Sequence, residues 1–412
     1  MLRPLRLALL CAGGAGVVGS VQAHHGFGTF DLQQDLTING VVTKIDFVNP
    51  HSWLYLSAVG DDGQQINWRC EMRAATVLRR SGWSPEMFGN GTRVTISGSP
   101  DRNDSRSCYV STITWADGTS MNRYGQREKT EPVARPAREL RLASGELNIS
   151  GDWAPEQMVM TDPRGREGTL VPLSTADDFE PGEVPEGASP IAGARNATPP
   201  VAGAPPRQRP SPVELTDAGK AAAEGYDSRS PEDNPRMRCE TTSIIFDWTF
   251  DGPVNRITQS GDTITLQYGQ HGFTRTIHMN RTEHPANIEP SRSGHSIGRW
   301  ENDVLIVDTI GFLPGLLTGG VLHSDRLHVV ERFSFDPDKV AITRSYSAED
   351  PLYFVGQLTG SDTILVADVA YSPDPCTELT FVDYSREGQA QPASEPAPEA
   401  KPPAKPWWKF WD

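Results

Sequence analysis

Apolar and polar residues alternate in five short runs near the start of the chain, which is the pattern of half-buried β-strands. In the second run Leu54 and Leu56 share one face while Trp53 and Tyr55 share the other, because successive side chains of a strand point to opposite faces. Between the third and fourth runs, residues 73–80 are good helix formers. The pattern predicts three strands, a helix and two strands, with the strands at 37–47, 52–59, 65–72, 92–98 and 109–115.

This order of elements is that of an OB-type barrel with five strands. Closure of such a barrel brings the third strand beside the fifth. It would therefore place Cys70 beside Cys108 on neighbouring strands, as a disulfide requires. The topology and this cysteine pairing support one another.

A second series of β-type runs begins near residue 148 and is joined by turn sequences typical of hairpins. It opens with Gly151-Asp152-Trp153, a Gly-x-Trp step that is similar to the first strand of lipocalin-type barrels. With roughly eight to ten strands, this part is predicted to be an antiparallel barrel, lipocalin-like, or a sandwich. The hairpins and later strands are expected within 257–264, 300–304, 335–340, 342–347, 353–358, 363–371 and 379–383.

Composition agrees with an all-β protein of two units. The chain has 412 residues, 37% of them hydrophobic, with 38 Gly and 34 Pro, which allows buried cores but argues against long helices. Tracts rich in Pro, Ala and charged residues cannot bury enough apolar surface to order themselves. A short helix at 214–225 is expected to begin at the cap residue Thr216. The predicted organisation is a signal peptide at 1–23, an OB-like domain at 24–120, a linker at 121–147, a β-domain at 148–384 with a disordered Pro-rich insertion at 175–212, and a Pro-rich tail at 385–412.

The amino terminus has the features of a secretory signal peptide. Arg3 and Arg6 precede an apolar stretch at 7–18, and small residues surround a cleavage point after Ala23. No later stretch approaches the roughly 18 consecutive apolar residues of a membrane span. We therefore expect a soluble protein exported to the periplasm.

Cleavage after Ala23 would leave four cysteines, an even number that favours disulfides in an oxidising compartment. The simplest pairing that respects the two units joins Cys70 to Cys108 and Cys239 to Cys376. Three connectivities remain formally open. Zinc binding by these thiolates is disfavoured because no C-x-x-C spacing occurs.

The charge of the mature chain argues against nucleic acid as a partner. Loss of Arg3 and Arg6 from the 38 basic residues leaves 36 against 53 acidic residues, a net charge of −17. Such a surface repels phosphate backbones. The aromatic residues of the first unit therefore suit core packing, or a neutral glycan or hydrophobic small ligand, better than DNA.

Two resemblances agree with this organisation. The first unit carries His24-His25-Gly26-Phe27, Asn49-Pro50-His51, Asn67-Trp68 and Arg80-Ser81-Gly82-Trp83. Through these motifs, about the first hundred mature residues resemble an uncharacterised family of small exported bacterial domains with an OB-like pattern, which begin with two histidines and carry an Asn-Pro-His step. This resemblance implies the fold and the exported location, and no activity.

The second unit carries Gly294-His295-Ser296-Ile297-Gly298-Arg299-Trp300-Glu301-Asn302-Asp303, Asp308-Thr309, Gly311-Phe312, His323-Ser324 and His328-Val329-Val330-Glu331-Arg332. Through these motifs, most of residues 148–350 resemble a second exported bacterial family without assigned activity. The chain departs from that family's pattern in its extended Pro-rich insertion.

The segment Gly294 to Gly298 also matches the Gly-x-Ser-x-Gly nucleophile elbow, with Asp308 and a histidine following in the hydrolase order. That motif requires a strand before the serine and a helix after it, whereas a hairpin follows here. A strand-entry loop is the favoured interpretation. No catalytic residue is assigned.

Histidines offer a second chemistry. Six of the nine lie within 58 residues of the second unit, and imidazoles with carboxylates suit zinc, iron or copper. No pair has the spacing of a helical metal motif, so strand and loop histidines held by hydrogen bonds are the competing interpretation. The candidate ligands in this unit are His284, His295, His323, His328 and Glu331.

A third candidate is the new amino terminus. Cleavage after Ala23 would give His24 a free amine beside the imidazoles of His24 and His25, a set of nitrogen ligands that suits copper(II). His51 is a further candidate ligand for this site. The competing interpretation is a frayed terminus with exposed histidines.

The carboxyl terminus carries four aromatic residues on a Pro-rich stalk: Trp407, Trp408, Phe410 and Trp411. Such residues need a receiving surface, either a membrane interface, a protein groove or a barrel of the same chain. Taken together, the sequence predicts an exported, non-catalytic binding or scaffold protein whose partner is an unknown small ligand or an envelope protein. The alternative is a copper- or zinc-binding protein, or a metal-dependent enzyme, that uses the histidines named above.

Overall fold

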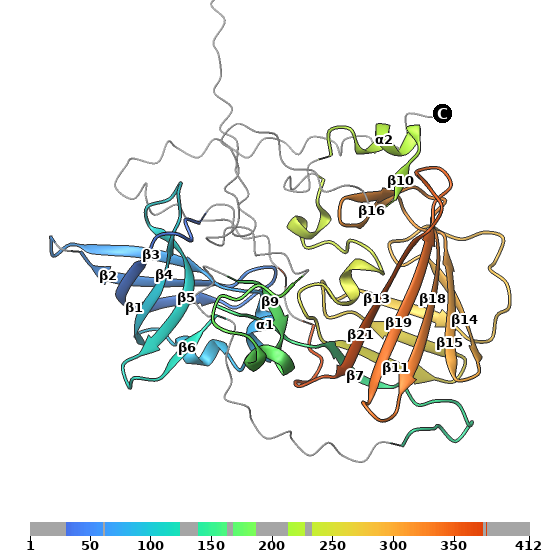
Figure 1. Ribbon diagram of the computed structural model, residues 1–412, viewed down its shortest axis with the longest axis horizontal. Helices are drawn as coiled ribbons and strands as arrows, with labels where there is room; N and C mark the ends of the chain where they lie inside the picture. The colour runs from blue at the N-terminus through green and yellow to red at the C-terminus, as the bar shows by residue number, and fades with distance from the viewer. Residues whose placement is uncertain are drawn as a thin grey trace, which may run out of the picture.

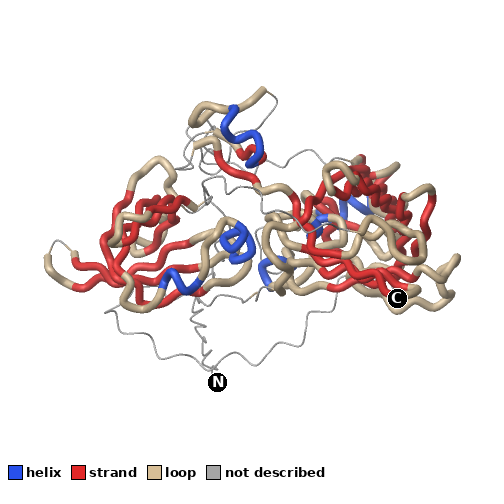
Figure 2. The backbone as a smooth tube through the Cα atoms, turned by 90° about the horizontal axis from the view of Figure 1, so that it is seen from below, coloured by secondary structure: helices blue, strands red, loops and turns tan. Residues whose placement is uncertain are grey.

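A computed structural model of the protein describes residues 30–60, 62–123, 139–162, 168–186, 213–226, 233–373 and 376. Two bodies rich in β-strands lie side by side (Figure 1). Seen from below, the strands again gather in two groups, with short helices between them (Figure 2). The protein is therefore built from two all-β units, as the sequence predicts.

The first unit is a small barrel whose strands follow the order β3-β2-β1-β4-β5-β6, with β3 also paired to β5. Its elements are β1 (Leu36–Asp46), β2 (Trp53–Val59), β3 (Gln65–Glu71), α1 (Ala75–Arg80), η2 (Pro85–Phe88), β4 (Arg93–Pro100), β5 (Ser107–Trp115) and β6 (Ser120–Asn122). The parallel pairing of β3 with β5 closes five strands into the predicted OB-like barrel.

A disulfide fastens the closure of this barrel. Cys70 of β3 lies directly opposite Cys108 of β5, and the two are joined with a Cα–Cα distance of 4.4 Å. Both cysteines are fully buried among the apolar side chains of the core, which include Leu54, Leu78 and Trp83. The predicted pairing is confirmed.

The second unit is a closed barrel of nine strands in the order β11-β12-β13-β14-β15-β18-β19-β21-β7. These strands are β7 (Gly151–Pro155), β11 (Asn255–Ser260), β12 (Thr263–Gln267), β13 (Thr274–His278), β14 (His295–Glu301), β15 (Val304–Ile310), β18 (His328–Asp336), β19 (Ala341–Glu349) and β21 (Leu358–Val366). Barrel and sandwich were both open from the sequence, and the structure is a barrel. One pair, β13 with β14, runs parallel, and the 16-residue connection between them, 279–294, is long enough for the chain to return to the same end of the barrel, as a parallel pair requires.

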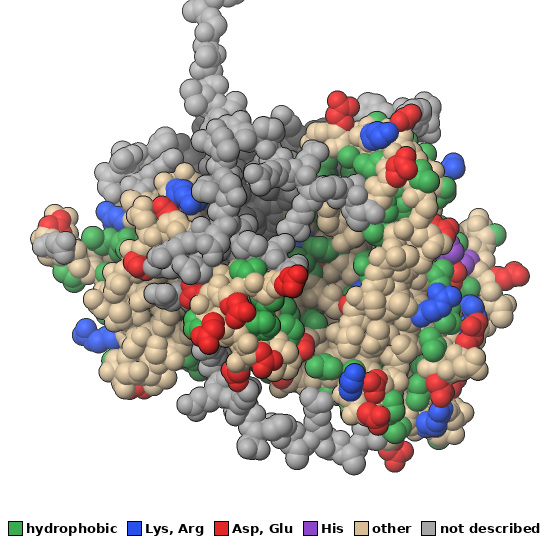
Figure 3. All heavy atoms as spheres, in the orientation of Figure 1, with side chains coloured by type: hydrophobic (Ala, Val, Ile, Leu, Met, Phe, Trp, Pro, Cys, Tyr) green, Lys and Arg blue, Asp and Glu red, His purple; other side chains and the backbone are tan. Residues whose placement is uncertain are grey.

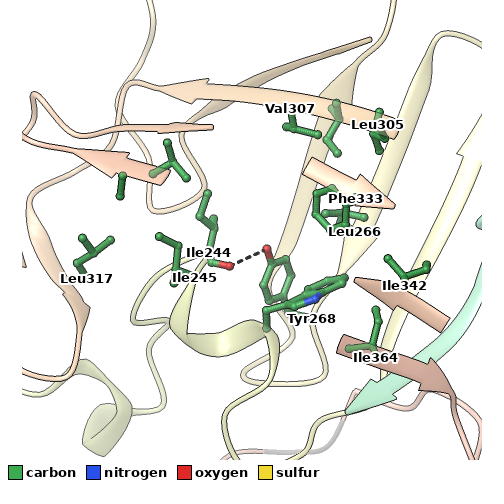
Figure 4. Close-up of a cluster of buried hydrophobic side chains, with 14 of the residues drawn as sticks. Ile244, Ile245, Leu266, Tyr268, Leu305, Val307, Leu317, Phe333, Ile342 and Ile364 are labelled. Carbon is green, nitrogen blue, oxygen red and sulfur yellow. Dashed lines mark hydrogen bonds between the residues drawn. The ribbon is translucent and has the colours of Figure 1, made fainter. Parts of the chain in front are cut away.

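One end of the second barrel is filled by the segment that precedes β11. Within it, η5 (Phe246–Trp248) places Trp248 in the core with no exposed surface. The Tyr268 hydroxyl donates a hydrogen bond to the Ile244 carbonyl oxygen, 3.2 Å away (Figure 4). Arg344 donates to the carbonyl oxygens of Ile244 and Ile245 from inside the barrel. These contacts hold the segment as a plug.

Several smaller elements lie outside the strand order of the two barrels. They are β8 (Met158–Met160), β9 (Leu170–Pro172), η3 (Leu173–Asp178), β10 (Glu214–Leu215), α2 (Asp217–Ala223), η4 (Pro235–Arg238), β16 (Gly315–Thr318), β17 (Val321–His323) and β20 (Phe354–Val355). The predicted cap of α2 is confirmed, since the Thr216 hydroxyl accepts from the Gly219 amide at 3.0 Å. The helix η3 extends into the range 175–212 that was expected to be a disordered insertion, and Ala176 and Phe179 of that range pack beside β8 and β9. Residues 187–212 of that range lie outside the described residues.

The second predicted disulfide, Cys239 with Cys376, is also present, with a Cα–Cα distance of 5.6 Å. Cys376 in turn forms a β-bridge with Asn49 of the first unit.

None of the helices in the described part of the chain has the length and apolar character needed to cross a bilayer. The predicted signal peptide, the strand at 379–383 and the aromatic tail fall outside the described residues.

Candidate functional site

Five polar side chains gather on the outer wall of the second barrel, and we call them the histidine face: His278, His284, His295, Asp308 and His328. Strand geometry explains why they meet. Asp308 of β15 pairs with Ile297 of β14 on one side and with Val330 of β18 on the other. His295 and His328 lie two residues before those partners, so they share the outward face with Asp308.

His284 comes from the connection between β13 and β14 and lies at the centre of the face. Its Nδ1 atom is 2.8 Å from Nδ1 of His295, and its Nε2 atom is 2.9 Å from Oδ1 of Asp308. The other carboxylate oxygen, Oδ2, is 3.0 Å from Nε2 of His328. The ring of His278 stacks on that of His295, with centroids 5.0 Å apart and planes inclined by 16°. His295, His284, Asp308 and His328 thus form one continuous chain of hydrogen bonds.

The electrostatics of the face centre on Asp308. Burial by itself raises the pKa of this carboxyl, but hydrogen bonds from His328 and His284 outweigh it and lower the pKa. The hydrogen bond to Asp308 raises the pKa of His328, whereas burial lowers the pKa of His278 and of His295. Asp308 is therefore an ionised acceptor at neutral pH, and His295 and His278 remain neutral.

The face is accessible to solvent. Exposed fractions of the side chains rise from 14% for His284 through 29% for Asp308 to 39% for His328. Histidine side chains are visible at the edge of the second barrel, among acidic and basic groups (Figure 3). A shallow groove of about 320 Å³ begins at His328 and continues over β18 and β19, lined by His328, Val330, Arg332, Ser347, Glu349 and Gln357.

Two of the predicted metal ligands lie elsewhere. His323 of β17 is buried, its Nδ1 atom lies 2.9 Å from the Ser324 carbonyl oxygen, and its ring meets Phe312 edge-on. Burial lowers the pKa of His323 to about 4. Glu331 faces the opposite way from His328 and lies inside the barrel with no exposed surface. Of the five candidates in this unit, the structure brings together His284, His295 and His328 only.

Inside the barrel, Glu331 is held between two arginines. Its Oε2 atom is 2.5 Å from Arg275 Nη2 and its Oε1 atom is 3.2 Å from Arg344 Nη1. Arg344 also pairs with Asp362, at 2.5 Å. Burial raises the pKa of the Asp362 carboxyl, against the opposing effect of Arg344. Both arginines are 1% exposed, so the network is a structural core of charges.

The serine of the Gly-x-Ser-x-Gly segment belongs to this interior. Ser296 is 1% exposed in β14, its hydroxyl accepts from Arg275 Nε at 2.8 Å, and it lies 3.0 Å from the Thr309 hydroxyl. The chain continues as the β14–β15 hairpin. The structure thus places Ser296 within strand β14 rather than in the strand-entry loop that the sequence favoured, and a hairpin instead of a helix follows it.

His51, the ligand candidate of the first barrel, lies at the boundary between the two units. Its Nδ1 atom is 2.6 Å from Oε1 of the buried Glu71. Burial lowers the pKa of His51, but Glu71 outweighs burial and raises it overall, and Asp251 and Arg236 of the second unit also act on it. The other candidates of that set, His24 and His25, and the tail residues Trp407, Trp408, Phe410 and Trp411 fall outside the described residues.

The same boundary contains a residue that sequence reasoning did not single out as functional, Arg80 of α1. It is 5% exposed, and its guanidinium donates to Pro155 O at 2.8 Å, to Gly252 O at 2.8 Å and to Asp368 Oδ1 at 3.0 Å. All three acceptors belong to the second unit. Arg80 therefore fastens the first barrel to the second, a role that no local pattern reveals.

Asp308 was not among the predicted ligands either, although a signal for it was present. Asn302 and Asp303 form the turn of the β14–β15 hairpin with positive φ values of 48° and 63°, as hairpin turns of this kind require. Counting back from that turn pairs Ile297 with Asp308 and puts His295 on the same face. The partners from more distant segments, His284 and His328, have no such signal.

Within the described ranges, no group of three or more His, Cys, Asp or Glu side chains is arranged to hold a metal ion. The histidine face offers instead one pair of converging nitrogen atoms and a carboxylate that contacts two imidazoles. Such an arrangement can accept or donate hydrogen bonds, and it can share a proton or a small ligand between neighbouring rings.

Comparison with known proteins gives a likeness for the first unit. A family of unknown function, DUF6152, matches residues 13–109, and the match ends in β5, so the second barrel lies wholly beyond it. No curated protein matches the chain, and no solved structure matches it. The chain is thus similar over its first barrel to a family that has no assigned activity.

Proposed function

We propose that this protein is an exported, non-catalytic binding protein whose binding surface is the histidine face of the second barrel. The observation that carries the proposal is the convergence of four imidazoles and one carboxylate on an accessible outer wall. Exposed polar groups that converge from several strands are typical of binding sites rather than of structural packing.

The filled interior of the second barrel supports an outer rather than an inner site. Lipocalin-type barrels hold ligands inside. Here Trp248, Arg275, Glu331 and Arg344 occupy the interior, each at most 1% exposed. Binding is therefore assigned to the outer wall and the groove that continues from His328.

The first barrel acts in this proposal as a rigid support. Arg80 donates to two backbone carbonyls and one carboxylate of the second unit, and Gln157 Nε2 donates to Arg80 O at 3.0 Å in return. Charge-assisted hydrogen bonds in a buried setting are strong and directional. They fix the orientation of one barrel relative to the other, as a scaffold requires.

Export is supported by the two disulfides, Cys70–Cys108 and Cys239–Cys376. Disulfides persist in oxidising compartments such as the periplasm and are rare in the cytosol. Sequencing of the protein recovered from the periplasm is expected to begin at His24. A mature chain that retains Met1 would contradict export by a cleaved signal peptide.

Histidine footprinting tests the binding surface. Diethyl pyrocarbonate modifies accessible imidazoles, and mass spectrometry of the peptides reports each histidine separately. We expect His328 and His295 to be protected in intact periplasm relative to purified protein, because the ligand is present there. The buried His323 serves as an internal control that stays unreactive in both samples. Equal reactivity of His328 and His295 in the two samples would overturn the assignment of this surface.

A further inference from the structure

We propose that the histidine face binds a divalent transition-metal ion of the zinc or copper class, with Nδ1 of His284 and Nδ1 of His295 as its two protein ligands. This inference rests on the proposed function, because it names the ligand class of the same surface. Asp308 is the positioning residue of the site and does not touch the ion.

The rings of His284 and His295 already face one another. Their Nδ1 atoms lie 2.8 Å apart, so one of them carries a hydrogen and the other a lone pair. Two imidazole ligands of a tetrahedral zinc ion, with Zn–N bonds of about 2.0–2.1 Å, have their nitrogens about 3.3 Å apart. To hold the ion, the rings separate by about 0.5 Å and turn so that both Nδ1 atoms point at it, and the hydrogen between them moves from Nδ1 to Nε2 of His295 through the solvent.

The contact with Asp308 selects one tautomer of His284. Oδ1 of Asp308 lies 2.9 Å from Nε2 of His284, and a carboxylate oxygen is an acceptor, so Nε2 is the donor of this hydrogen bond. In the neutral imidazole with this tautomer, Nδ1 presents its lone pair to His295. A carboxylate that accepts the second N–H of a histidine is the arrangement found behind metal-ligating histidines, where it orients the ring and raises its basicity.

The surrounding residues hold these groups in place. His328 Nε2 holds the second oxygen of Asp308 at 3.0 Å, and His278 stacks on the ring of His295. His295 begins β14 and Asp308 lies within β15, so both are built on paired strands of the barrel. Groups carried by strands are held more precisely than groups carried by loops.

Asp308 supplies the negative charge of the site, and the guanidinium of Arg281 is near enough to act electrostatically on His295 and His278. No three-ligand group exists among the described residues, so this site has two protein ligands and leaves the other coordination positions to water or to groups of a bound partner. An open coordination sphere of this kind suits a protein that binds a ligand through its metal.

The test uses the mature protein purified without a histidine tag, and zinc as the probe. Isothermal titration calorimetry is expected to show one site at the face. His284→Gln and His295→Gln should each weaken zinc binding at least about 10-fold, and Asp308→Asn about 10- to 100-fold, as removal of a carboxylate behind a ligating histidine does elsewhere. Circular dichroism melting curves verify that each variant is folded.

His271→Asn is the matched control. His278 is the last residue of β13, whereas His271 lies three residues before its first residue. His271 has a positive φ of 54°, a conformation that Asn tolerates. The zinc affinity of the His271→Asn variant should equal that of the wild type. The double variant His24→Ala/His25→Ala removes the amino-terminal histidines and should retain the site at the face. With copper(II), electron paramagnetic resonance of this double variant should show coupling to two imidazole nitrogens.

Unchanged zinc binding in folded His284→Gln and His295→Gln would overturn the metal site, as would the absence of binding in the wild type. The two proposals fail separately. If His328 and His295 are protected in intact periplasm but purified protein binds no zinc or copper, the surface binds a ligand of another class and only the metal is rejected.

Discussion

Glu331 and Asp308 lie on neighbouring strands of the same barrel, and each is a carboxylate between two groups that can carry positive charge. Glu331 points inward, has no exposed surface and is paired with two arginines. Asp308 points outward, is 29% exposed and contacts two histidines. Arginine is charged at every accessible pH, whereas histidine gains and loses its proton near neutrality. The inner cluster is therefore fixed in charge and structural, and the outer cluster is adjustable and open to a ligand.

Replacing Glu331 with Gln should have the largest effect on stability. The change leaves Arg275 and Arg344 buried without their shared negative partner, and removal of one member of a buried ion cluster costs about 3–5 kcal/mol. Asp308→Asn, the matched change on the outer wall, should cost less than about 1 kcal/mol. Urea unfolding monitored by tryptophan fluorescence measures both. Equal losses would erase the distinction between the inner and outer clusters.

Arg80→Ala tests a third buried cation, whose partners are mostly backbone carbonyls. Loss of its bonds to Pro155, Gly252 and Asp368 should cost about 2–3 kcal/mol, because hydrogen bonds from charged donors contribute about 1.5–3 kcal/mol each and water replaces part of them. The two barrels should then melt in separate steps in differential scanning calorimetry. A single unchanged transition would show that Arg80 does not couple the barrels.

Ser296→Ala should have a smaller effect. The hydroxyl accepts one hydrogen bond from Arg275 and shares another with the Thr309 hydroxyl. Because each intramolecular hydrogen bond contributes about 1 kcal/mol, the expected loss is about 1–2 kcal/mol. Because Ser296 is 1% exposed, a fluorophosphonate probe should leave the folded wild type unlabelled. Rapid, specific labelling of Ser296 would instead support a serine hydrolase and reverse the assignment of this residue to the core.

The smallest effect concerns pH and His328. Its pKa is raised in the folded protein above the ordinary value of 6.5 by the hydrogen bond to Asp308. The stability that it contributes is therefore fully present below pH 6.5 and is lost as the pH rises through the raised value. For this half-exposed pair the contribution is less than about 1 kcal/mol. Wild type and His328→Gln should differ in unfolding midpoint at pH 5.5 and converge at pH 8.5. A difference that grows with pH would contradict the pairing.

The first barrel and both disulfides were predictable because their signals are local or follow from a known closure. Alternation located β1 to β5, and the order of strands and helix indicated which strand closes on which. The cysteines then had one pairing that agreed with this topology, which the structure confirms. The hairpin register of β14 and β15 was equally readable from its turn.

The histidine face was predictable only in part. The histidine-rich sequence indicated that imidazoles matter, and it named His284, His295 and His328. It also named His323, which is buried in β17, and Glu331, which lies inside the barrel. A strand that alternates assigns Glu331 and His328 to opposite faces, yet alternation alone does not say which face is outward. The outward face is decided by the closure of the barrel, which places Trp248, Arg275 and Arg344 in its interior.

Sequence alone determined the β-rich class, the predicted strand order of the first unit, an even number of cysteines with one favoured pairing, and the presence of a histidine-rich region. Each follows from patterns over a few residues or from simple counting. Tertiary structure alone decided that His284 and His328 meet on Asp308, that Glu331 is neutralised from two other strands and that Arg80 reaches the second barrel. These contacts join residues far apart in the chain, and their geometry is set by barrel closure and by the docking of one barrel on the other. No local pattern encodes that geometry, because it depends on all the strands at once.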